Sequence, residues 1–147
     1  MNVSFRWVIL RSLPVIQTSC GPAPGKKTHG IRSRRGGVYK STDGGLTWEL
    51  KGLEGTQAIG RVVVHPTNSD WVYVAALGHP WGANEERGLY RTRDGGETWE
   101  RVHYVSEDAG FVDVDMHPQD PNIIWATSWK RVRGLYFLQS GGPGSSI

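Results

Sequence analysis

The sequence predicts an all-β protein built from repeated sheets. The chain has 147 residues, enough for one ordinary domain. It is poor in aliphatic residues but contains 20 Gly and 7 Trp, which suits strands joined by many tight turns better than helices. An internal repeat supports the same fold class. No apolar run approaches the roughly 20 residues of a membrane-spanning helix, so no membrane span is predicted.

Two different motifs recur with one spacing. GGVYKSTDGGLTWEL at 36–50 matches RGLYRTRDGGETWER at 87–101, and VVVHPTNSDWVYVAA at 62–76 matches VDMHPQDPNIIWATS at 114–128. Asp43 and Asp94 are 51 residues apart, and Pro66 and Pro118 are 52 apart. A period of this size is typical of the four-stranded blades of a β-propeller.

The strands can be placed in order within one period. Residues 36–52 hold the last two strands of an earlier blade. A complete blade covers about 59–106, with strands expected at 61–65, 71–77, 88–93 and 98–105. Residues 110–129 hold the first two strands of a later blade, and the sequence is expected to stop at 140–147, where Gly-Leu-Tyr would open the next hairpin. The sequence therefore predicts part of a propeller, with one full blade between two partial ones.

The repeated Ser/Thr-x-Asp-x-Gly-x-Thr-Trp phrase predicts a hairpin turn. An Asp side chain can accept hydrogen bonds from backbone N–H groups of its own turn, and glycine tolerates a positive φ. The hydroxyl groups can complete the network, and the Trp can pack at the start of the outer strand. The residues of the two copies are Ser41, Asp43, Gly45, Thr47 and Trp48, and then Thr92, Asp94, Gly96, Thr98 and Trp99.

This phrase closely resembles the Asp-box, also called the bacterial neuraminidase-type repeat, of sialidase, xyloglucanase and sortilin propellers. Over about 36–144 the chain is most similar to large bacterial sortilin-like repeat proteins, often named glycosyl hydrolases by similarity. The resemblance implies that Asp43 and Asp94 are structural and lie away from any active site. A Ca²⁺ loop would need more carboxylates and a distal Glu. We expect no metal and no cofactor.

Residues 1–34 differ in composition from 35–147. Residues 1–35 carry seven Lys or Arg and no Asp or Glu, whereas 36–147 carry ten against fourteen. One hypothesis is an out-of-frame translation of the preceding blade: synonymous codons for 11–33, read one base earlier, can encode APSDPNIVWAGT, which resembles HPQDPNIIWATS at 117–128. The alternative is a genuine basic leader. It lacks the pattern of a nucleic-acid reading helix, so no nucleic-acid partner is predicted.

The segment GHPWGANEERG at 78–88 is the candidate ligand-binding loop. It joins two strands of the full blade and is too long for a tight hairpin. Aromatic rings beside carboxylates and amides suit sugar binding, and a Glu can act as a general acid or base. Neighbouring carboxylates are nevertheless not the facing pair that glycoside hydrolysis needs. An ordered, solvated loop is the simpler interpretation. The candidate residues are His79, Trp81, Asn84, Glu85, Glu86 and Arg87.

Three further features have structural interpretations beside functional ones. His65 and His117 recur in His-Pro turns and stand on separate blades, so we expect turns rather than one shared metal. The basic and aromatic cluster at 128–137 is in the style of single-strand nucleic-acid binding, but solvated charges around a loop explain it equally. Asp113 and Asp115 share a strand face, as in a metal or glycosidase site, and outward polar positions also explain them.

Two functional hypotheses follow. The first is a scaffold or a peptide- or glycan-binding module of an extracytoplasmic propeller, without catalysis of its own, whose partners include the remaining blades. The alternative is part of a xyloglucanase- or sialidase-like glycoside hydrolase whose catalytic carboxylates lie mostly on other blades. A secreted or periplasmic location is implied by the resemblance alone, and catalytic residues cannot be assigned, because fold resemblance does not carry activity.

Overall fold

A computed structural model describes residues 36–42, 46–79 and 81–147, and these form an all-β structure without a helix. The predicted fold class is therefore confirmed. The leader hypothesis concerns residues 1–34, which lie outside the described residues. The strands are β1 (Val38–Lys40), β2 (Glu49–Gly52), β3 (Ala58–Val64), β4 (Val72–Gly78), β5 (Gly88–Thr92), β6 (Glu100–His103), β7 (Ala109–Met116), β8 (Ile124–Arg133) and β9 (Leu138–Ser140).

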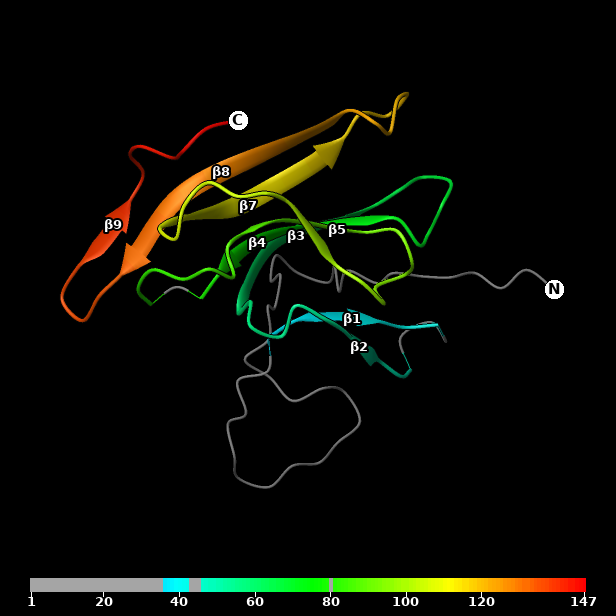
Figure 1. The fold of residues 1–147 in the computed structure, drawn as a ribbon, viewed down its shortest axis with the longest axis horizontal. Helices are drawn as coiled ribbons and strands as arrows, with labels where there is room; N and C mark the ends of the chain where they lie inside the picture. Colours follow the sequence, from blue (N-terminus) through cyan, green and yellow to red (C-terminus); the bar gives the residue numbers. More distant parts are fainter. Residues whose placement is uncertain (1–35, 43–45, 80) are drawn as a thin grey trace, which may run out of the picture.

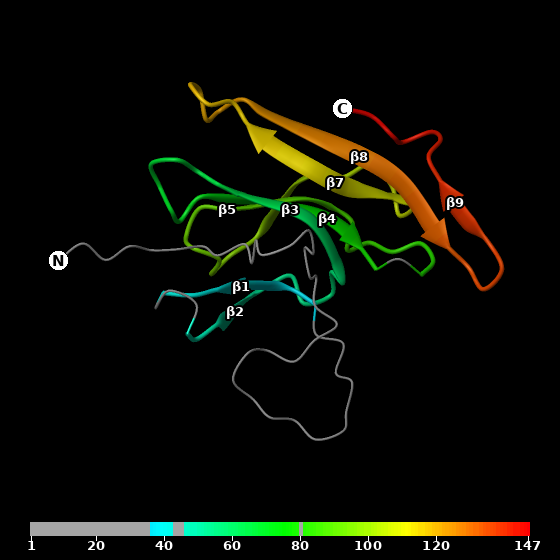
Figure 2. The same cartoon turned by 180° about the vertical axis from the view of Figure 1, so that it is seen from behind.

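The strands form three antiparallel sheets that follow one another along the chain. The first sheet pairs β1 with β2, the middle sheet has the order β3-β4-β5-β6, and the last sheet has the order β7-β8-β9. Figure 1 and Figure 2 show the three sheets layered in chain order, with the middle sheet between the other two. Each sheet is thus built from sequential neighbours, as a meander of short hairpins requires.

Strand β4 explains why the sheets stack on both sides. Its side chains alternate between the two faces of the middle sheet, as they must in any strand. Val72 and Val74 pack with Val38 in one core, which lies against the first sheet. Tyr73 and Ala75 belong to a second core with residues of β7. Because both faces are buried, β4 is apolar at nearly every position instead of alternating with polar residues.

The pairing register repeats with the sequence period. Val64 pairs with Val72 in the middle sheet, and Met116 pairs with Ile124 at the equivalent place in the last sheet. One irregularity of the strands repeats as well: the register shifts between Ile59 and Arg61 in β3, and between Phe111 and Asp113 in β7. The further shift between Ala58 and Ile59 has no counterpart in β7. The 52-residue sequence repeat is therefore a repeat of backbone geometry, bulge included.

At the shift in β3, the middle and last sheets approach each other closely. A Cβ atom added to Gly60 would lie 2.0 Å from the backbone oxygen of Val112. Beside it, Arg61 donates from its Nη1 to Asp113 Oδ1 at 2.9 Å. Arg61 and Asp113 occupy the same position of successive repeats. Glycine at position 60 thus lets the two backbones touch, and an exposed ion pair spans the contact.

The last sheet corrects the expectation of two strands. A third strand, β9, pairs with β8, with Arg131 opposite Ser140 and Arg133 opposite Leu138. The chain also contains a second copy of Arg-Gly-Leu-Tyr at 133–136, after the copy at 87–90 that opens the hairpin of the middle sheet. Here those residues form the turn before β9, closed by the Gly134 N–H donating to Phe137 O at 2.9 Å. The physical reason is that β8 continues to Arg133, past the point where β4 ends.

Candidate functional site

The connections between strands lie at two opposite ends of the sheets. We call the end with the His-Pro turns and the Asp-box turn the turn end, on the right in Figure 1. The opposite end, with the β4–β5 connection and the β8–β9 turn, is the loop end. Because the strands are antiparallel, successive connections alternate between these ends. The predicted Asp-box residues and the predicted ligand-binding residues therefore stand far apart.

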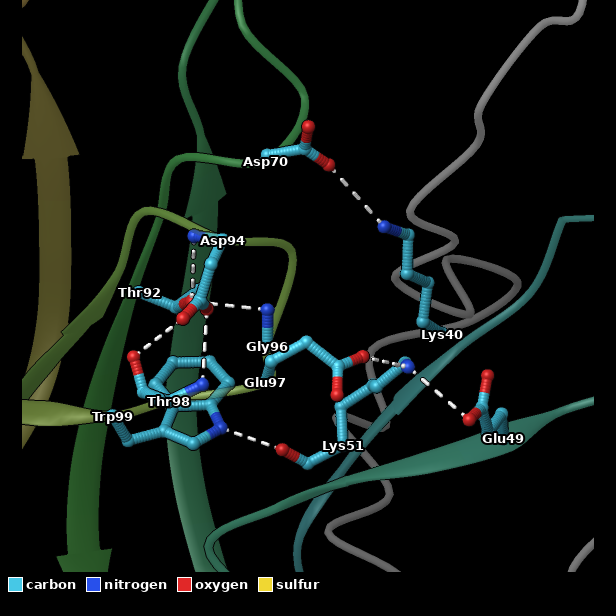
Figure 3. A network of polar contacts seen from close by, with 10 residues as sticks. All are labelled: Lys40, Glu49, Lys51, Asp70, Thr92, Asp94, Gly96, Glu97, Thr98 and Trp99. Carbon is cyan, nitrogen blue, oxygen red and sulfur yellow. Dashed lines mark hydrogen bonds and ion pairs between the residues drawn. The ribbon is translucent and has the colours of Figure 1, made fainter.

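The second Asp-box copy forms a closed hydrogen-bond network at the turn end (Figure 3). The Thr92 hydroxyl donates to Asp94 Oδ1 at 2.7 Å and accepts from the Gly96 N–H at 2.9 Å. Asp94 Oδ1 also accepts from the Thr98 N–H at 2.9 Å, while its Oδ2 accepts from the Thr98 hydroxyl. The bonds from Thr98, and then from Thr92, hold the pKa of Asp94 well below its ordinary range.

The backbone of this turn requires glycine at two positions. Gly95 has a φ of 74° and Gly96 a φ of 93°, which side chains rarely adopt. Space is short as well, because a Cβ on Gly95 would lie 2.9 Å from both Asp70 Oδ1 and Lys40 Nζ. The Gly95 N–H donates to the Asp70 carbonyl at 3.0 Å, so the Asp-box turn is joined to the neighbouring His-Pro turn.

Trp99 connects the Asp-box to the first sheet. Its indole Nε1 donates to the Lys51 carbonyl at 2.6 Å, from the middle sheet to β2 (Figure 3). The Lys51 ammonium lies 2.6 Å from Glu97 Oε1 and 3.1 Å from Glu49 Oε1. The hydrogen bonds from Lys51 to Glu97 and then Glu49 raise the pKa of Lys51. The tryptophan of one sheet is thus bound to the backbone of the sheet before it.

The first Asp-box copy is described in part. Ser41 is fully buried, as Thr92 is at the equivalent position. Thr47 is exposed and Trp48 is half-buried. Asp43 and Gly45 lie outside the described residues. The hydroxyl residue of the Asp-box is therefore buried in both copies.

The two His-Pro turns share one hydrogen-bond arrangement. His65 Nδ1 accepts from the backbone N–H groups of Thr67 and Asn68, both at 3.2 Å. His117 Nδ1 accepts from those of Gln119 and Asp120, at 3.1 and 3.0 Å. An imidazole nitrogen accepts only when it carries no proton, so each ring presents an unprotonated Nδ1 to its own turn. Each Nδ1 atom therefore accepts hydrogen bonds from backbone N–H groups, as expected for a structural turn.

At the loop end, two of the six candidate residues are buried. Asn84 donates from Nδ2 to the His79 carbonyl at 2.9 Å and accepts at Oδ1 from the His79 N–H at 3.3 Å, so it closes the loop on itself. Its own N–H donates to the Glu107 carbonyl at 3.0 Å, in the next connection. The amide of Asn84 therefore fixes the loop and is not available to a ligand.

Arg87 holds the middle and last sheets together. The residue is 1% exposed, and its guanidinium donates only to backbone carbonyls. The acceptors are His79 and Gly82 of its own loop, Asp108 of the β6–β7 connection at 3.1 Å, and Arg131 of β8 at 2.9 Å. Burial lowers the pKa of Arg87. Its position therefore makes Arg87 a clamp between segments rather than a ligand-binding cation.

The other four candidates are accessible. Trp81 is 44% exposed, and the Arg133 guanidinium lies over its ring, 4.9 Å from the centroid. His79 Nδ1 donates to the Trp81 carbonyl at 2.8 Å, because a carbonyl can only accept. The other ring nitrogen of His79 lies 3.7 Å from Glu86 Oε2. The Glu85 side chain is exposed.

His79 and Trp81 line an open depression at the loop end, together with Gln57 and Leu135. Gln57 was not predicted as a site residue, and Arg133 was considered only as part of the basic and aromatic cluster at 128–137, not with this loop. Gln57 follows the first hairpin and Leu135 belongs to the second Arg-Gly-Leu-Tyr copy, so only the three-dimensional repeat brings them to the loop. The recurrence of Arg-Gly-Leu-Tyr was the signal available in the sequence.

The remaining candidates are dispersed. Asp113 and Asp115 are both exposed on β7, where Asp113 pairs with Arg61 and each carboxylate accepts from the next backbone N–H. Lys130 lies 3.3 Å from Asp108, and Arg133 lies over Trp81. Within the described part of the chain, no group of three or more His, Cys, Asp or Glu side chains is arranged to hold a metal ion. The described residues also include no helix long and apolar enough to cross a membrane.

Comparisons with known proteins agree with this architecture. The family model Sortilin-Vps10, described as sortilin, neurotensin receptor 3, matches residues 36–140. A probable oligoxyloglucan-reducing end-specific xyloglucanase of Neosartorya fischeri is 30% identical over 112 residues, which cover 74% of this chain and 12% of that protein. The photosystem II assembly lipoprotein Ycf48 of Synechococcus is 28% identical over 123 residues, covering 84% of this chain and 32% of that protein.

Vacuolar protein sorting/targeting protein 10 of Sordaria macrospora is 29% identical over 94 residues, covering 63% of this chain and 6% of that protein. The chain thus spans a third or less of the length of each of these relatives. No solved structure matches the chain. The matched range contains all nine strands of the three stacked sheets and the Asp-box turns. The chain belongs to the Sortilin-Vps10 family of Asp-box β-propellers.

Proposed function

We propose that this chain is part of an extracytoplasmic propeller scaffold that binds a peptide or a glycan at its loop end. The observation that carries the proposal is the depression formed by Gln57, His79, Trp81 and Leu135. It offers a half-exposed indole beside an imidazole and an amide. Aromatic faces with a few placed polar groups are the usual composition of small-ligand sites.

The contacts made by the described residues of the loop support this role. Asn84 and Arg87 bind backbone carbonyls of the loop, and the Arg133 guanidinium rests on the Trp81 ring. A ligand would therefore meet an ordered surface and would not have to order the loop itself, which lowers the cost of binding. The loop connects β4, which is buried at nearly every position, with β5, so its two ends are set by the scaffold.

A structural role for the Asp-box residues is part of the same proposal. Asp94 accepts only from groups of its own turn, and Trp99 binds the preceding sheet. We assign the same role to Ser41, Asp43, Gly45, Thr47 and Trp48 by the sequence repeat. The Asp-box stands at the end of the sheets opposite the depression, so it can support the ligand site without touching a ligand.

The test is a binding screen of the chain against a glycan array that includes xyloglucan oligosaccharides, and against an array of unstructured peptides. We expect Trp81→Ala to weaken binding of the ligand found by about tenfold or more, because an anchoring aromatic often contributes over 1 kcal/mol. Trp125→Ala is the matched control, since that indole is similarly exposed on β8. Equal losses in both variants, or no ligand on either array, would refute the proposal.

Participation in glycoside hydrolysis is the second candidate. It is favoured by two relatives whose names are xyloglucanases, from Neosartorya fischeri and Hypocrea jecorina. Hydrolysis needs two carboxyl groups on either side of the scissile bond, about 5–10 Å apart. Glu86 is a loop-end carboxylate that approaches the depression through its contact with His79. Release of reducing ends from xyloglucan oligosaccharides, abolished in Glu86→Gln but not in Glu107→Gln, would favour the hydrolase over the binding module.

The extracytoplasmic location rests on the relatives, which include a protein named as a lipoprotein and another named for vacuolar sorting. Expression of the chain behind a cleavable export signal provides the check. We expect folded protein to accumulate outside the cytoplasm and to bind the same ligands as protein refolded in vitro. Degradation of the exported chain, with stable accumulation in the cytoplasm, would contradict the location.

A further inference from the structure

A small cavity lies between the middle and last sheets at the loop end, and it shares no lining residue with the depression. Its volume is about 30 Å³, and it is lined by Ala58, Leu77, Arg87 and Arg131. These residues belong to β3, β4, the connection before β5, and β8. Since roughly 10–15 Å³ is enough to admit one water molecule, the cavity has room for one monatomic ion or about two waters, but not for a sugar.

One donor of Arg87 has no acceptor within the protein. The Nη1 and Nη2 groups of Arg87 donate to four backbone carbonyls, whereas its buried Nε–H finds no acceptor among the described residues. The residue is 1% exposed, so bulk solvent does not reach this donor. A buried donor without a partner is costly and calls for a bound water or ion. Because Arg87 lines the cavity, a small acceptor placed there completes its hydrogen bonding.

The positive charge of Arg87 also lacks a counter-charge of its own. Arg87 forms no ion pair with any carboxylate of the described residues. Burial lowers the pKa of Arg87, and the Asp108 carboxylate opposes this lowering only in part. That carboxylate is itself paired with Lys130 Nζ at 3.3 Å. Since buried charges are normally paired, the environment of Arg87 favours a negative ion in the adjoining cavity.

Arg131 brings a second guanidinium to the same cavity. Its side chain forms no ion pair or hydrogen bond with the described residues, and it is exposed to solvent. Two cations that line one small space repel each other, and an anion between them is attracted to both. Because the Arg131 side chain is exposed, this wall of the cavity is also where an ion from solvent can enter.

We infer that this cavity binds one monovalent, monatomic anion of the size of chloride, held by the Arg87 Nε–H and the Arg131 guanidinium. The ion offsets the repulsion between the two guanidinium groups and so stabilises the contact between the middle and last sheets. Arg87 also donates to the His79 and Gly82 carbonyls, so the same ion helps to fix the loop that carries Trp81. The inference does not depend on what binds in the depression.

The test compares the stability of the 147-residue chain in sodium chloride and in sodium gluconate, whose anion is too large for the cavity. Both salts are used at about 150 mM, so that screening of surface charges is equal. An ion that binds only the folded state raises the ratio of folded to unfolded protein. For a dissociation constant of tens of mM, we expect this ratio to be about fivefold higher in chloride. Urea denaturation measures it.

Two variants remove the site in different ways. Arg131→Gln removes one guanidinium, whereas Ala58→Val fills part of the cavity and leaves both guanidinium groups in place. In each variant, the advantage of chloride over gluconate should fall below about twofold. Arg133→Gln is the matched control, because it removes an exposed loop-end cation that does not line the cavity. This control should keep the advantage of the wild type.

A direct measurement on the wild type covers the case in which a variant does not fold. The NMR resonance of chloride should broaden when the chain is added, and it should sharpen again on addition of bromide but not of sulfate. Equal stability in the two salts, or the absence of such broadening, would mean that the cavity holds water only. A chloride advantage that persists in Ala58→Val would place the ion on the surface instead. Loss of ligand binding in Trp81→Ala changes none of these results.

Discussion

At the scale of single residues, one polar side chain organises each end of the middle sheet. Asp94 accepts hydrogen bonds within the Asp-box at the turn end, and Arg87 donates to four carbonyls at the loop end. Their environments differ, because Asp94 is exposed and Arg87 is buried. Asp94 therefore acts through the geometry of one turn, whereas Arg87 acts across three segments of the chain.

Replacing Asp94 by Asn should lower the melting temperature at neutral pH, because the Thr92 and Thr98 bonds depend on a charged acceptor. The folded-state pKa of Asp94 is lowered, so its stabilisation is present above the unfolded value, which is about 4. It is lost as the pH falls through the lower folded value. The difference in melting temperature between the wild type and Asp94→Asn should therefore shrink below about pH 4.

The matched control for this prediction is Glu107→Gln, which alters an exposed carboxylate outside the turn. Thermal unfolding followed by circular dichroism from pH 7 to pH 2 measures both variants. A difference between wild type and Asp94→Asn that does not change with pH would contradict the assigned role of the carboxylate.

Replacing Arg87 by Ala should reduce the free energy of unfolding by about 3 kcal/mol, because it leaves several buried carbonyls without donors. Arg87→Lys should recover little of this loss, since an ammonium cannot reproduce the fork of the guanidinium. Urea denaturation measures the change, with Arg131→Ala as the control because that side chain is exposed. Similar losses in Arg87→Ala and Arg131→Ala would show that Arg87 is not a clamp.

The sequence predicted that the Asp-box residues form a local hairpin turn, but it did not predict which residues of the loop at 78–88 are buried. Ser/Thr-x-Asp-x-Gly-x-Thr-Trp names a local turn, so its hydrogen bonds lie within a few residues. Asn84 and Arg87 find partners at Glu107, Asp108 and Arg131, which are distant in sequence. The segment 78–88 is largely polar, so its sequence alone did not show which of its side chains are exposed. Tertiary contacts bury Asn84 and Arg87 and leave the other four candidate residues accessible.

At the scale of elements, one glycine and one tryptophan make contacts between successive sheets. Gly60 lets β3 approach β7, and Trp99 binds the carbonyl of Lys51 on β2. Gly60 thus links the middle sheet to the last sheet, and Trp99 links it to the first sheet. The strands were predicted from apolar alternation and turn residues, and β4 is apolar at nearly every position because both its faces are covered. The third strand of the last sheet was missed, because residues 137–140 have neither the Asp-box nor clear alternation.

Gly60→Ala should lower the free energy of unfolding by about 2 kcal/mol, because the added methyl group meets the backbone of Val112 and forces the sheets apart. Gly55→Ala is the control, since a Cβ there meets the flexible side chain of Glu86 and should cost less than about 0.5 kcal/mol. Chemical denaturation of both variants makes the comparison. Equal stability of the two would mean that the sheets do not approach at Gly60.

Trp99→Phe should cost about 1 kcal/mol, because it keeps the ring but removes the Nε1 donor to the Lys51 carbonyl. The loss should be local, with faster amide exchange in β1 and β2 than in β7 and β8. Hydrogen-exchange mass spectrometry gives the distribution, and Trp125→Phe, which changes an exposed ring, is the control. Uniformly faster exchange throughout the chain would argue against a specific link to the first sheet.

At the scale of the whole molecule, the three sheets repeat one geometry, and the ends of the sheets are specialised. The turn end carries the His-Pro turns and the Asp-box, and the loop end carries the depression with Trp81. The period of the sequence was sufficient to predict this order, since equivalent residues are 51–52 positions apart. It could not predict which residues of the last sheet are exposed, because that depends on whether another sheet covers Trp125 and Leu135.

The stacking of the sheets on both faces of β4 is the central claim, and nuclear Overhauser contacts in solution test it most directly. The side chains of Val72 and Val74 should show contacts to Val38, and those of Tyr73 should show contacts to Phe111 and Val114. Contacts of neighbouring β4 residues to one and the same flanking sheet, or to neither, would contradict the stacked repeat.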